Sequence, residues 1–217
     1  MSYKYPECVE KVEIYPPQAG SVAAACEKHN GYPNGGCKGS TSKPQPCKFN
    51  PSCAGRSCAG VRFWLEVTLD RFSEGAKDTM VVILKNPSQA TATVCDITIR
   101  NVIEYIYSKK KSTGKIIILN LMPVYSTAAK TVKPHHICPL NIECIKCITK
   151  QHKDIIAAWG GNTTSLPNSD YNSLTGGVVG ILTANGCTVS RVGDLNVTGH
   201  PKHGQRWSSA DKIYKYP

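Results

Sequence analysis

Four short apolar runs in this chain are each followed by polar or glycine-rich residues. The runs are Met80–Leu84, Ile116–Leu119, Ile155–Ala158 and Cys187–Val192. Runs this short, rich in valine and isoleucine and separated by helical patterns, are typical of buried strands in a parallel sheet. Ligands of open α/β sheets bind beyond the carboxyl ends of the strands. We therefore expect the residues that follow the four runs to converge on one cleft.

The positions after the runs carry side chains that are able to bind a ligand or to react. Amides and imidazoles dominate them, and the third group adds two glycines. These positions are Asn86, Pro87 and Ser88 after the first run, Asn120 after the second, Trp159 to Asn162 after the third, and His200 to His203 beyond the fourth.

Helical patterns lie between the runs. Asp96 is placed to cap a helix, and apolar residues then recur with helical spacing. A shorter helix is predicted over Asn141–Gln151, and a clearer one over Tyr171–Ala184, which Asn185 and Gly186 would stop. The buried stripes are expected to be Ile99, Val102, Ile103 and Ile106 in the first helix, and Leu174, Val178, Ile181 and Leu182 in the last.

The order of these elements is strand, helix, strand, helix, strand, helix, strand. It predicts an α/β fold with three layers (αβα) around a central, mostly parallel, four-stranded sheet, joined by right-handed crossovers. The segment Arg62–Leu69 is typical of a further strand, placed antiparallel at the sheet edge.

Residues 1–58 differ from the rest of the chain. They contain six of the eleven cysteines and many proline, glycine, serine and lysine residues, with little apolar periodicity. We predict a cysteine-rich arm dominated by loops over 1–58, followed by an α/β domain over 59–217.

The chain is strongly basic. Its 26 Lys and Arg residues against 15 Asp and Glu give a formal charge of +11, which favours a polyanionic partner such as DNA. No segment has the roughly twenty apolar residues of a membrane span, and the N-terminus lacks the apolar core of a signal peptide. We expect a cytoplasmic protein that does not bind membranes, and a monomer.

Cysteines of a protein in a reducing compartment either bind metal or pack in the interior. Thiolates suit zinc or an iron–sulfur cluster, and the sequence does not separate these two cofactors. Plain packing is the alternative for each cysteine, and it is the expectation for Cys95 and Cys187. The candidate ligands are Cys26, Cys37, Cys47, Cys53, Cys58, Cys138, Cys144 and Cys147.

The landmarks together resemble the signature of a prokaryotic and phage family known as a domain of unknown function, DUF1643. The resemblance covers roughly Val61 to Pro217, in order and at sensible spacing. It rests on Asn86-Pro87-Ser88, Ala92-Thr93, Asp96 to Arg100, Asn120-Leu121, Trp159-Gly160 and Gly199-His-Pro-Lys-His203.

The same order of motifs is similar to that of the uracil-DNA glycosylase superfamily. This resemblance implies that Asn86 positions an attacking water, that Asn120 reads the polar edge of a flipped base, and that His200 supports the developing base anion. Some branches of that superfamily carry a four-iron cluster near the DNA. The chain departs from the pattern by having Lys85 before Asn86 and Ser88 after Pro87, where glycines are usual, and its base-stacking aromatic residue is not identifiable.

The expected function is therefore that of a DNA glycosylase acting on a modified or damaged base, most simply a pyrimidine, in repair or phage defence. Breaking an N-glycosidic bond builds positive charge on the sugar and negative charge on the leaving base, which suits imidazole and amide groups. Asp96 completes the catalytic candidates. Pro87, Ser88 and Trp159 join Asn120 at the base, and Lys202, His203, Arg206 and Arg100 are expected to contact DNA.

Two other functions are open at this point. A non-catalytic module would use the same pocket to sense a base in nucleic acid, and a hydrolase or transferase would act on free nucleotides through Asp96 or His200. Each landmark also has a structural explanation, since asparagine forms turns, Asp96 caps a helix and Trp159 packs. Trp207 is open in the same way, as a wedge between bases or as a packed residue.

Overall fold

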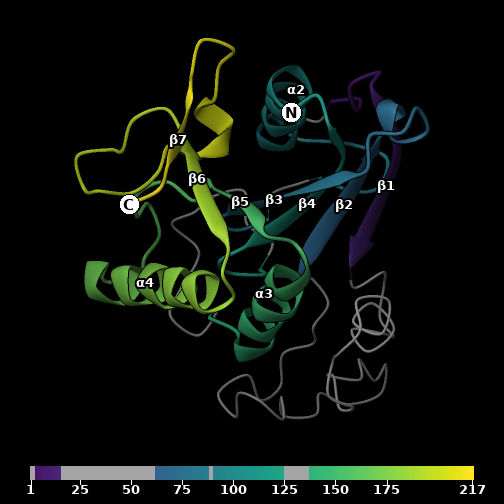
Figure 1. The fold of residues 1–217 in the computed structure, drawn as a ribbon. Coiled ribbons are helices and arrows are strands. Elements are labelled where there is room, and N and C mark those ends of the chain that lie inside the picture. Colours follow the sequence, from purple (N-terminus) through teal and green to yellow (C-terminus); the bar gives the residue numbers. More distant parts are fainter. Residues whose placement is uncertain (1–2, 16–61, 88–89, 125–136) are drawn as a thin grey trace.

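The computed structural model describes residues 3–15, 62–87, 90–124 and 137–217. They form a sheet of seven strands with helices on both faces (Figure 1). The strands are β1 (Val9–Tyr15), β2 (Trp64–Leu69), β3 (Asp78–Leu84), β4 (Thr113–Asn120), β5 (Asp154–Ala157), β6 (Thr188–Val192) and β7 (Ile213–Lys215). The helices are α2 (Ile97–Lys109), α3 (Pro139–Gln151) and α4 (Asn168–Ala184), with short 3-10 turns η2 (Asp70–Phe72) and η5 (Gly204–Arg206).

The order of strands across the sheet is β1-β2-β4-β3-β5-β6-β7. β3 pairs in parallel with β4 and β5, and β5 pairs in parallel with β6. β1, β2 and β7 pair antiparallel with their neighbours. The α/β class is confirmed, but the predicted sheet of four strands is too small, because the sheet is mixed and seven-stranded.

The strand expected at Arg62–Leu69 is present as β2 and is antiparallel, but it is not at the edge. β1 pairs with its outer side, with Val12 opposite Val67, while β4 pairs with its inner side. Nothing in the sequence of β2 itself indicates that β1, an earlier segment of the chain, pairs with its outer side.

Residues from the N-terminal region take part in this domain. Besides β1, Tyr3 forms a two-way backbone bridge with Cys95, at 2.9 Å in both directions. Residues 1–2 and 16–58 of the predicted arm lie outside the described residues, so the loop-rich character of this segment stays a prediction. No helix in the described part of the chain combines the length and the apolar character needed to cross a membrane.

Helix α2 covers one face of the sheet. Its stripe Ile99, Val102, Ile103 and Ile106 is buried as predicted, and it packs on alternate residues of the strands, among them Val82 and Ile118. The even-numbered residues of β3 and β4 face this side because successive side chains of a strand point to opposite faces.

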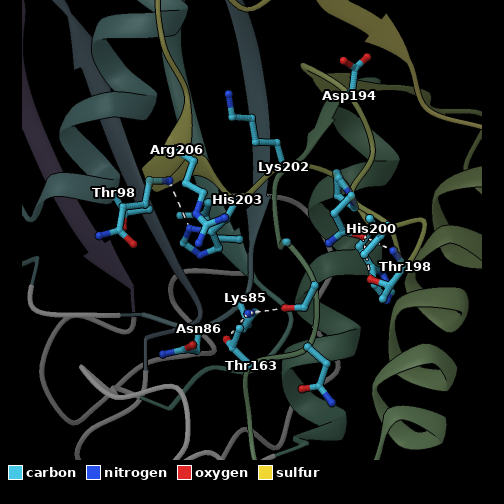
Figure 2. Close-up of a pocket in the computed structure, with 18 of the residues that line it drawn as sticks. Lys85, Asn86, Thr98, Thr163, Asp194, Thr198, His200, Lys202, His203 and Arg206 are labelled. Atoms are coloured by element: carbon cyan, nitrogen blue, oxygen red, sulfur yellow. Dashed lines mark hydrogen bonds between the residues drawn. The ribbon is translucent and has the colours of Figure 1, made fainter.

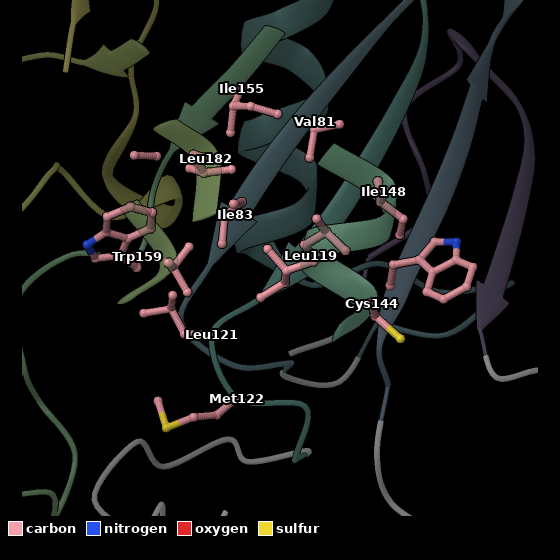
Figure 3. Close-up of a cluster of buried hydrophobic side chains, with 14 of the residues drawn as sticks. Val81, Ile83, Leu119, Leu121, Met122, Cys144, Ile148, Ile155, Trp159 and Leu182 are labelled. Carbon is pink, nitrogen blue, oxygen red and sulfur yellow. The ribbon is translucent and has the colours of Figure 1, made fainter. Parts of the chain in front are cut away.

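Helices α3 and α4 cover the other face (Figure 3). Val81, Ile83 and Leu119 from the strands pack with Cys144 and Ile148 of α3. Within α4, Leu174, Val178 and Leu182 are buried as predicted, whereas Ile181 is only half-buried. The helix stops where expected, with Gly186 at a φ of +67° after Asn185.

The chain reverses its direction across the sheet after β4. It passes from β3 to β4 on one side, and α3 then carries it over β4 and β3 to β5 on the other side. The loops that leave β3 and β5 therefore diverge at the carboxyl ends of two adjacent parallel strands. This divergence is the topological switch point at which open α/β sheets bind ligands.

Asp96 caps α2. Its Oδ1 atom accepts hydrogen bonds from the backbone N–H groups of Thr98, at 2.8 Å, and Ile99, at 3.0 Å, and its carboxylate is buried. A negative charge at this end is also favoured by the helix dipole. The structural explanation of Asp96 therefore holds, and a capping carboxylate committed to two amides is a poor general base.

Removing this cap should destabilise the fold. We expect Asp96→Ala to lower the free energy of unfolding by about 1 kcal/mol, while Asp96→Asn, which keeps a capping oxygen, should retain most of the stability. Urea denaturation followed by circular dichroism measures both, with Asp194→Ala as an exposed-carboxylate control. An equal loss in the Asn and Ala variants would show that the cap is not the source.

Candidate functional site

A cavity of about 880 Å³ lies at the switch point (Figure 2). Its walls are the segments that follow β3, β5 and β6, together with the first turns of α2 and α4. This size falls within the range of small-molecule sites in proteins. The polar residues on its walls include Lys85, Asn86, Thr163, Asn172, Asn196, His200, Lys202, His203 and Arg206.

Lys85 follows β3 directly and is buried, with 4% of its surface exposed. Its ammonium donates to the carbonyl oxygen of Gly161 at 2.7 Å and to the hydroxyl of Thr163 at 2.6 Å. Burial and the neighbouring charge of Arg206 lower the pKa of Lys85 to about 8. Sequence reasoning missed this residue, although a lysine directly after a buried strand was a usable signal.

The next residue, Asn86, lies on the cavity wall as the sequence predicted. Its side-chain amide donates to the carbonyl oxygen of Pro87 at 3.0 Å, so the loop leaving β3 turns tightly at this point. Pro87 is buried and does not line the cavity. Ser88 lies outside the described residues.

The segment after β5 approaches its neighbours closely. Gly160 has a φ of +69°, and a Cβ atom there would lie 2.9 Å from the Cβ of His203. A Cβ on Gly161 would lie 2.7 Å from the side-chain amide of Asn196. Tyr171 of α4 donates its hydroxyl to the carbonyl oxygen of Gly160 at 2.9 Å. The two glycines are therefore needed to bring the later loop over the end of β5.

Asn196 organises the loop that carries His200. Its side-chain oxygen accepts from the backbone N–H of Thr198 at 2.9 Å, the hydroxyl of Thr198 at 2.7 Å and the backbone N–H of His200 at 3.0 Å. The backbone of Asn196 in turn donates to the carbonyl oxygen of His200 at 2.9 Å. These hydrogen bonds hold the loop from Asn196 to His200 in a closed turn on the cavity wall.

His200 is held by α4. Its Nε2 atom lies 3.1 Å from Oδ1 of Asn172, and its ring meets the Tyr171 ring edge-on with centroids 5.2 Å apart. Because an amide oxygen only accepts, Nε2 carries the proton and Nδ1 has the lone pair. Burial and the charge of Lys85 lower the pKa of His200 below its ordinary value, so the ring is neutral at neutral pH.

His203 is also neutral. Its Nδ1 atom accepts from the backbone N–H of Gln205 at 3.2 Å, which caps η5 and leaves the proton on Nε2. Burial, followed by the charges of Lys85 and Arg206, lowers the pKa of His203 to about 4. The next residue, Gly204, packs against α2 and β3, where a Cβ atom would lie 2.8 Å from Val102 and 2.9 Å from Leu84.

Asn120 and Trp159 are not on the cavity wall. Both are fully buried, and Trp159 packs in the core with Tyr216 edge-on to its ring. Neither side-chain polar atom of Asn120 has a hydrogen-bond partner among the described residues, and the same holds for Nε1 of Trp159. Buried polar groups are rarely left unpaired, because each costs on the order of 1–3 kcal/mol. Trp159 thus fills a packing role, while Asn120 keeps an unused donor and acceptor behind the end of β4.

The predicted DNA-contacting cations differ in their surroundings. Lys202 pairs with both carboxylate oxygens of Asp211, at 2.9 and 2.8 Å, and Arg100 pairs with Glu104 on the exposed face of α2. Arg206 lines the cavity and has no acidic partner among the described residues. Trp207 is buried against Tyr105, with ring centroids 5.2 Å apart. It is a packed residue and not a wedge.

The cysteine candidates give no metal centre in the described part of the chain. No group of three or more His, Cys, Asp or Glu residues there is arranged to hold a metal ion. Cys144, a residue of α3, is buried in the core, and Cys138 precedes the first turn of that helix. Cys26, Cys37, Cys47, Cys53 and Cys58 lie outside the described residues. Zinc or an iron–sulfur cluster therefore stays a prediction for the arm.

Comparison with protein families assigns the chain. The model of the family described as "Protein of unknown function (DUF1643)" matches residues 62–204. The chain belongs to this family. The match spans the strands β2 to β6 and ends at Gly204, so it contains all the residues that line the cavity except Gln205, Arg206 and Asp211. Searches of curated proteins and of solved structures found no match.

The close approach at Gly160 yields a stability test. Gly160→Ala should cost about 1–2 kcal/mol, because its positive φ disfavours a side chain and the new Cβ meets His203. The matched control is Gly180→Ala, on the open side of α4, which should stabilise the protein by roughly 0.5–1 kcal/mol. Thermal denaturation compares them. A neutral Gly160→Ala would contradict the close packing of the two loops.

His203 should make stability depend on pH. Its pKa of about 4 in the folded state lies below the ordinary 6.5, so between these values the unfolded chain binds more protons than the folded one. The free energy of unfolding should therefore fall as the pH drops from about 6.5 to 4. His203→Asn, which keeps an acceptor for Gln205, should flatten this fall. An imidazole resonance of His203 that titrates near 6.5 would contradict the burial.

Proposed function

We propose that this protein is a DNA glycosylase that hydrolyses the N-glycosidic bond of a modified or damaged base. The observation that carries the proposal is that Asn86 and the His200–His203 loop, far apart in the sequence, line one cavity at the switch point of the sheet. The order of motifs along the chain, from Asn86 to His200, resembles that of the uracil-DNA glycosylase superfamily. We propose that the fold is also related to that of the uracil-DNA glycosylase superfamily.

The chemistry required is the replacement of the base by water at the sugar carbon. The bond between this carbon and the base nitrogen breaks and its electron pair leaves with the base. The water oxygen then bonds to the carbon, and its proton ends on the base or in solvent. The amide oxygen of Asn86 would orient the water, and the lone pair on Nδ1 of His200 would accept a proton.

Stabilisation of the departing base is the second requirement. The single proton of His200 faces Asn172, so this ring is a weak donor to a base anion. Lys85 also lines the cavity, and its charge adds to the effect of burial in lowering the pKa of both histidines. A fixed positive charge in a buried site acts far more strongly than one in water.

Base recognition is proposed for Asn120. Its unpaired donor and acceptor match the polar edge of a pyrimidine. Because Asn120 is fully buried and does not line the cavity, a base would reach it only after a local rearrangement of the protein.

The DNA partner is supported by charge and shape. The chain carries a formal charge of +11, and Arg206 presents an unpaired cation at the cavity. Val197 stands fully exposed at the tip of the loop beside the cavity. An apolar side chain at such a rim could fill the gap that a flipped base leaves in the stack.

Asn86→Ala should abolish base release and leave DNA binding intact. A loss of at least about a hundredfold is expected for a group that acts in the chemical step. The assay incubates the protein with a panel of DNAs, including phage genomes with modified bases, and detects abasic sites and free bases by mass spectrometry. Asn86→Asp keeps an oxygen that accepts from water and should retain more activity. Binding without release of any base by the wild-type protein would instead support a base-sensing module.

A further inference from the structure

The buried lysine at the end of β3 is not explained by the fold alone. Lys85 donates two hydrogen bonds, to the carbonyl oxygen of Gly161 and to Thr163. An ammonium has three N–H groups, and no acceptor for the third is found among the described residues. A second observation points the same way, because a charge that is 96% removed from solvent normally has an ionic partner.

Carboxylates near Lys85 are already engaged or distant. Asp211, which lines the cavity, bonds to Lys202 and to Ser208. Asp194 is exposed and lies at the far side of the cavity from Lys85 in Figure 2. Among the described residues no ion pair involves Lys85 or Arg206. Two cations therefore line one cavity, and neither is paired with a carboxylate among the described residues.

Neutral donors complete this end of the cavity. Nε2 of His203 bears a proton because Nδ1 accepts a hydrogen bond from the backbone N–H of Gln205. Besides burial, the charges of Lys85 and Arg206 lower the pKa of this ring, so both cations lie near it. In Figure 2 the side chains of His203 and Arg206 lie together above Lys85. The arrangement offers an ammonium, a guanidinium and an imidazole N–H to one acceptor-only group.

We propose that Lys85, Arg206 and His203 form a subsite for a phosphate group. A phosphate has several acceptor oxygens and carries the charge that this end of the cavity lacks. This inference deepens the proposed function. It rests on that function where the phosphate is taken to be a backbone phosphate next to the extruded nucleotide. The phosphate of a free nucleotide has the same chemistry and is the other source.

Because the pKa of Lys85 is about 8, the phosphate subsite can be tested in the wild-type protein by changing the pH. The titratable groups around Lys85 are Arg206 on η5, His200 and His203 on the loop before it, and Tyr171 of α4, whose ring centroid lies 5.8 Å from the ammonium. Asp96, at the start of α2, acts on His203 and raises its pKa slightly against the larger lowering effects. Both histidines have lowered pKa values and burial raises the pKa of Tyr171. Of these groups, only the ammonium of Lys85 then changes its charge between pH 7 and 9.

The first experiment titrates the full chain with inorganic sulfate at constant ionic strength and follows the imidazole resonances of His200 and His203. Sulfate keeps the same charge from pH 7 to 9, so any change in affinity comes from the protein. With a pKa of about 8, the protonated fraction of Lys85 falls about tenfold over this range, and the affinity should fall with it. Sulfate binding that is absent at pH 7, or unchanged at pH 9, overturns the proposal.

The second experiment uses variants. Lys85→Met and Arg206→Gln should each weaken sulfate binding at least tenfold, whereas Lys111→Met, which removes an exposed lysine outside the cavity, should not. If Lys85→Met fails to fold, Arg206→Gln and the pH series decide. Folded variants that bind sulfate as the wild type does overturn the subsite.

A comparison of two further probes identifies the source of the phosphate. Loss of affinity for a single-stranded oligodeoxynucleotide in Arg206→Gln assigns the site to a phosphodiester of the strand. Loss confined to deoxythymidine 5′-monophosphate assigns it to a free nucleotide. All readouts are of binding, so a subsite confirmed in a protein that releases no base would refute the glycosylase and leave the phosphate site standing.

Discussion

The contact between the end of β5 and the loop after β6 holds the site together. Gly204 donates its backbone N–H to the carbonyl oxygen of Ala158 at 3.2 Å, while Gly160 and Gly161 leave room for His203 and Asn196. Without this contact, the loop that carries His200 and His203 would not be held at the carboxyl end of β5. With it, they face Lys85 and Asn86 across the ends of two parallel strands. The candidate chemistry therefore depends on a backbone approach that only glycine permits.

The electrostatics of the cavity follow from the same approach. Burial of the Lys85 ammonium against the segment after β5 costs free energy. Hydrogen bonds to the carbonyl oxygen of Gly161 and to the hydroxyl of Thr163 offset part of this cost. Burial of the two imidazole rings, together with the charge of Lys85, lowers the pKa of both histidines and keeps them neutral. A site with neutral imidazoles and one buried cation attracts an anion while keeping lone pairs available, a combination that a fully solvated cluster of Lys and His would not have.

Prediction from sequence succeeded where the signal is local. The apolar runs became β3 to β6, Asp96 caps α2, and the spacing of Ile99, Val102, Ile103 and Ile106 placed one face of that helix in the core. It failed where the partner lies far along the chain. Nothing in Arg62–Leu69 reveals that β1 pairs outside it, and the three residues of β7 are too few for a pattern. Trp159 and Lys202 illustrate the same limit, since packing and an ion pair with Asp211 decided their roles.

The sequence by itself determined the layered α/β class, the positions of the polar residues after each strand, and the membership of the family. It could do so because strand periodicity, helix caps and motif spacing are properties of short segments. Only the tertiary structure decided which of those residues share the cavity. Asn86, His200, His203 and Arg206 line it, Asn120 and Trp159 lie behind it, and Lys85 joins them. The physical reason is that burial and charge pairing arise between segments that the sheet brings together. The sequence of a single segment therefore indicates neither of them.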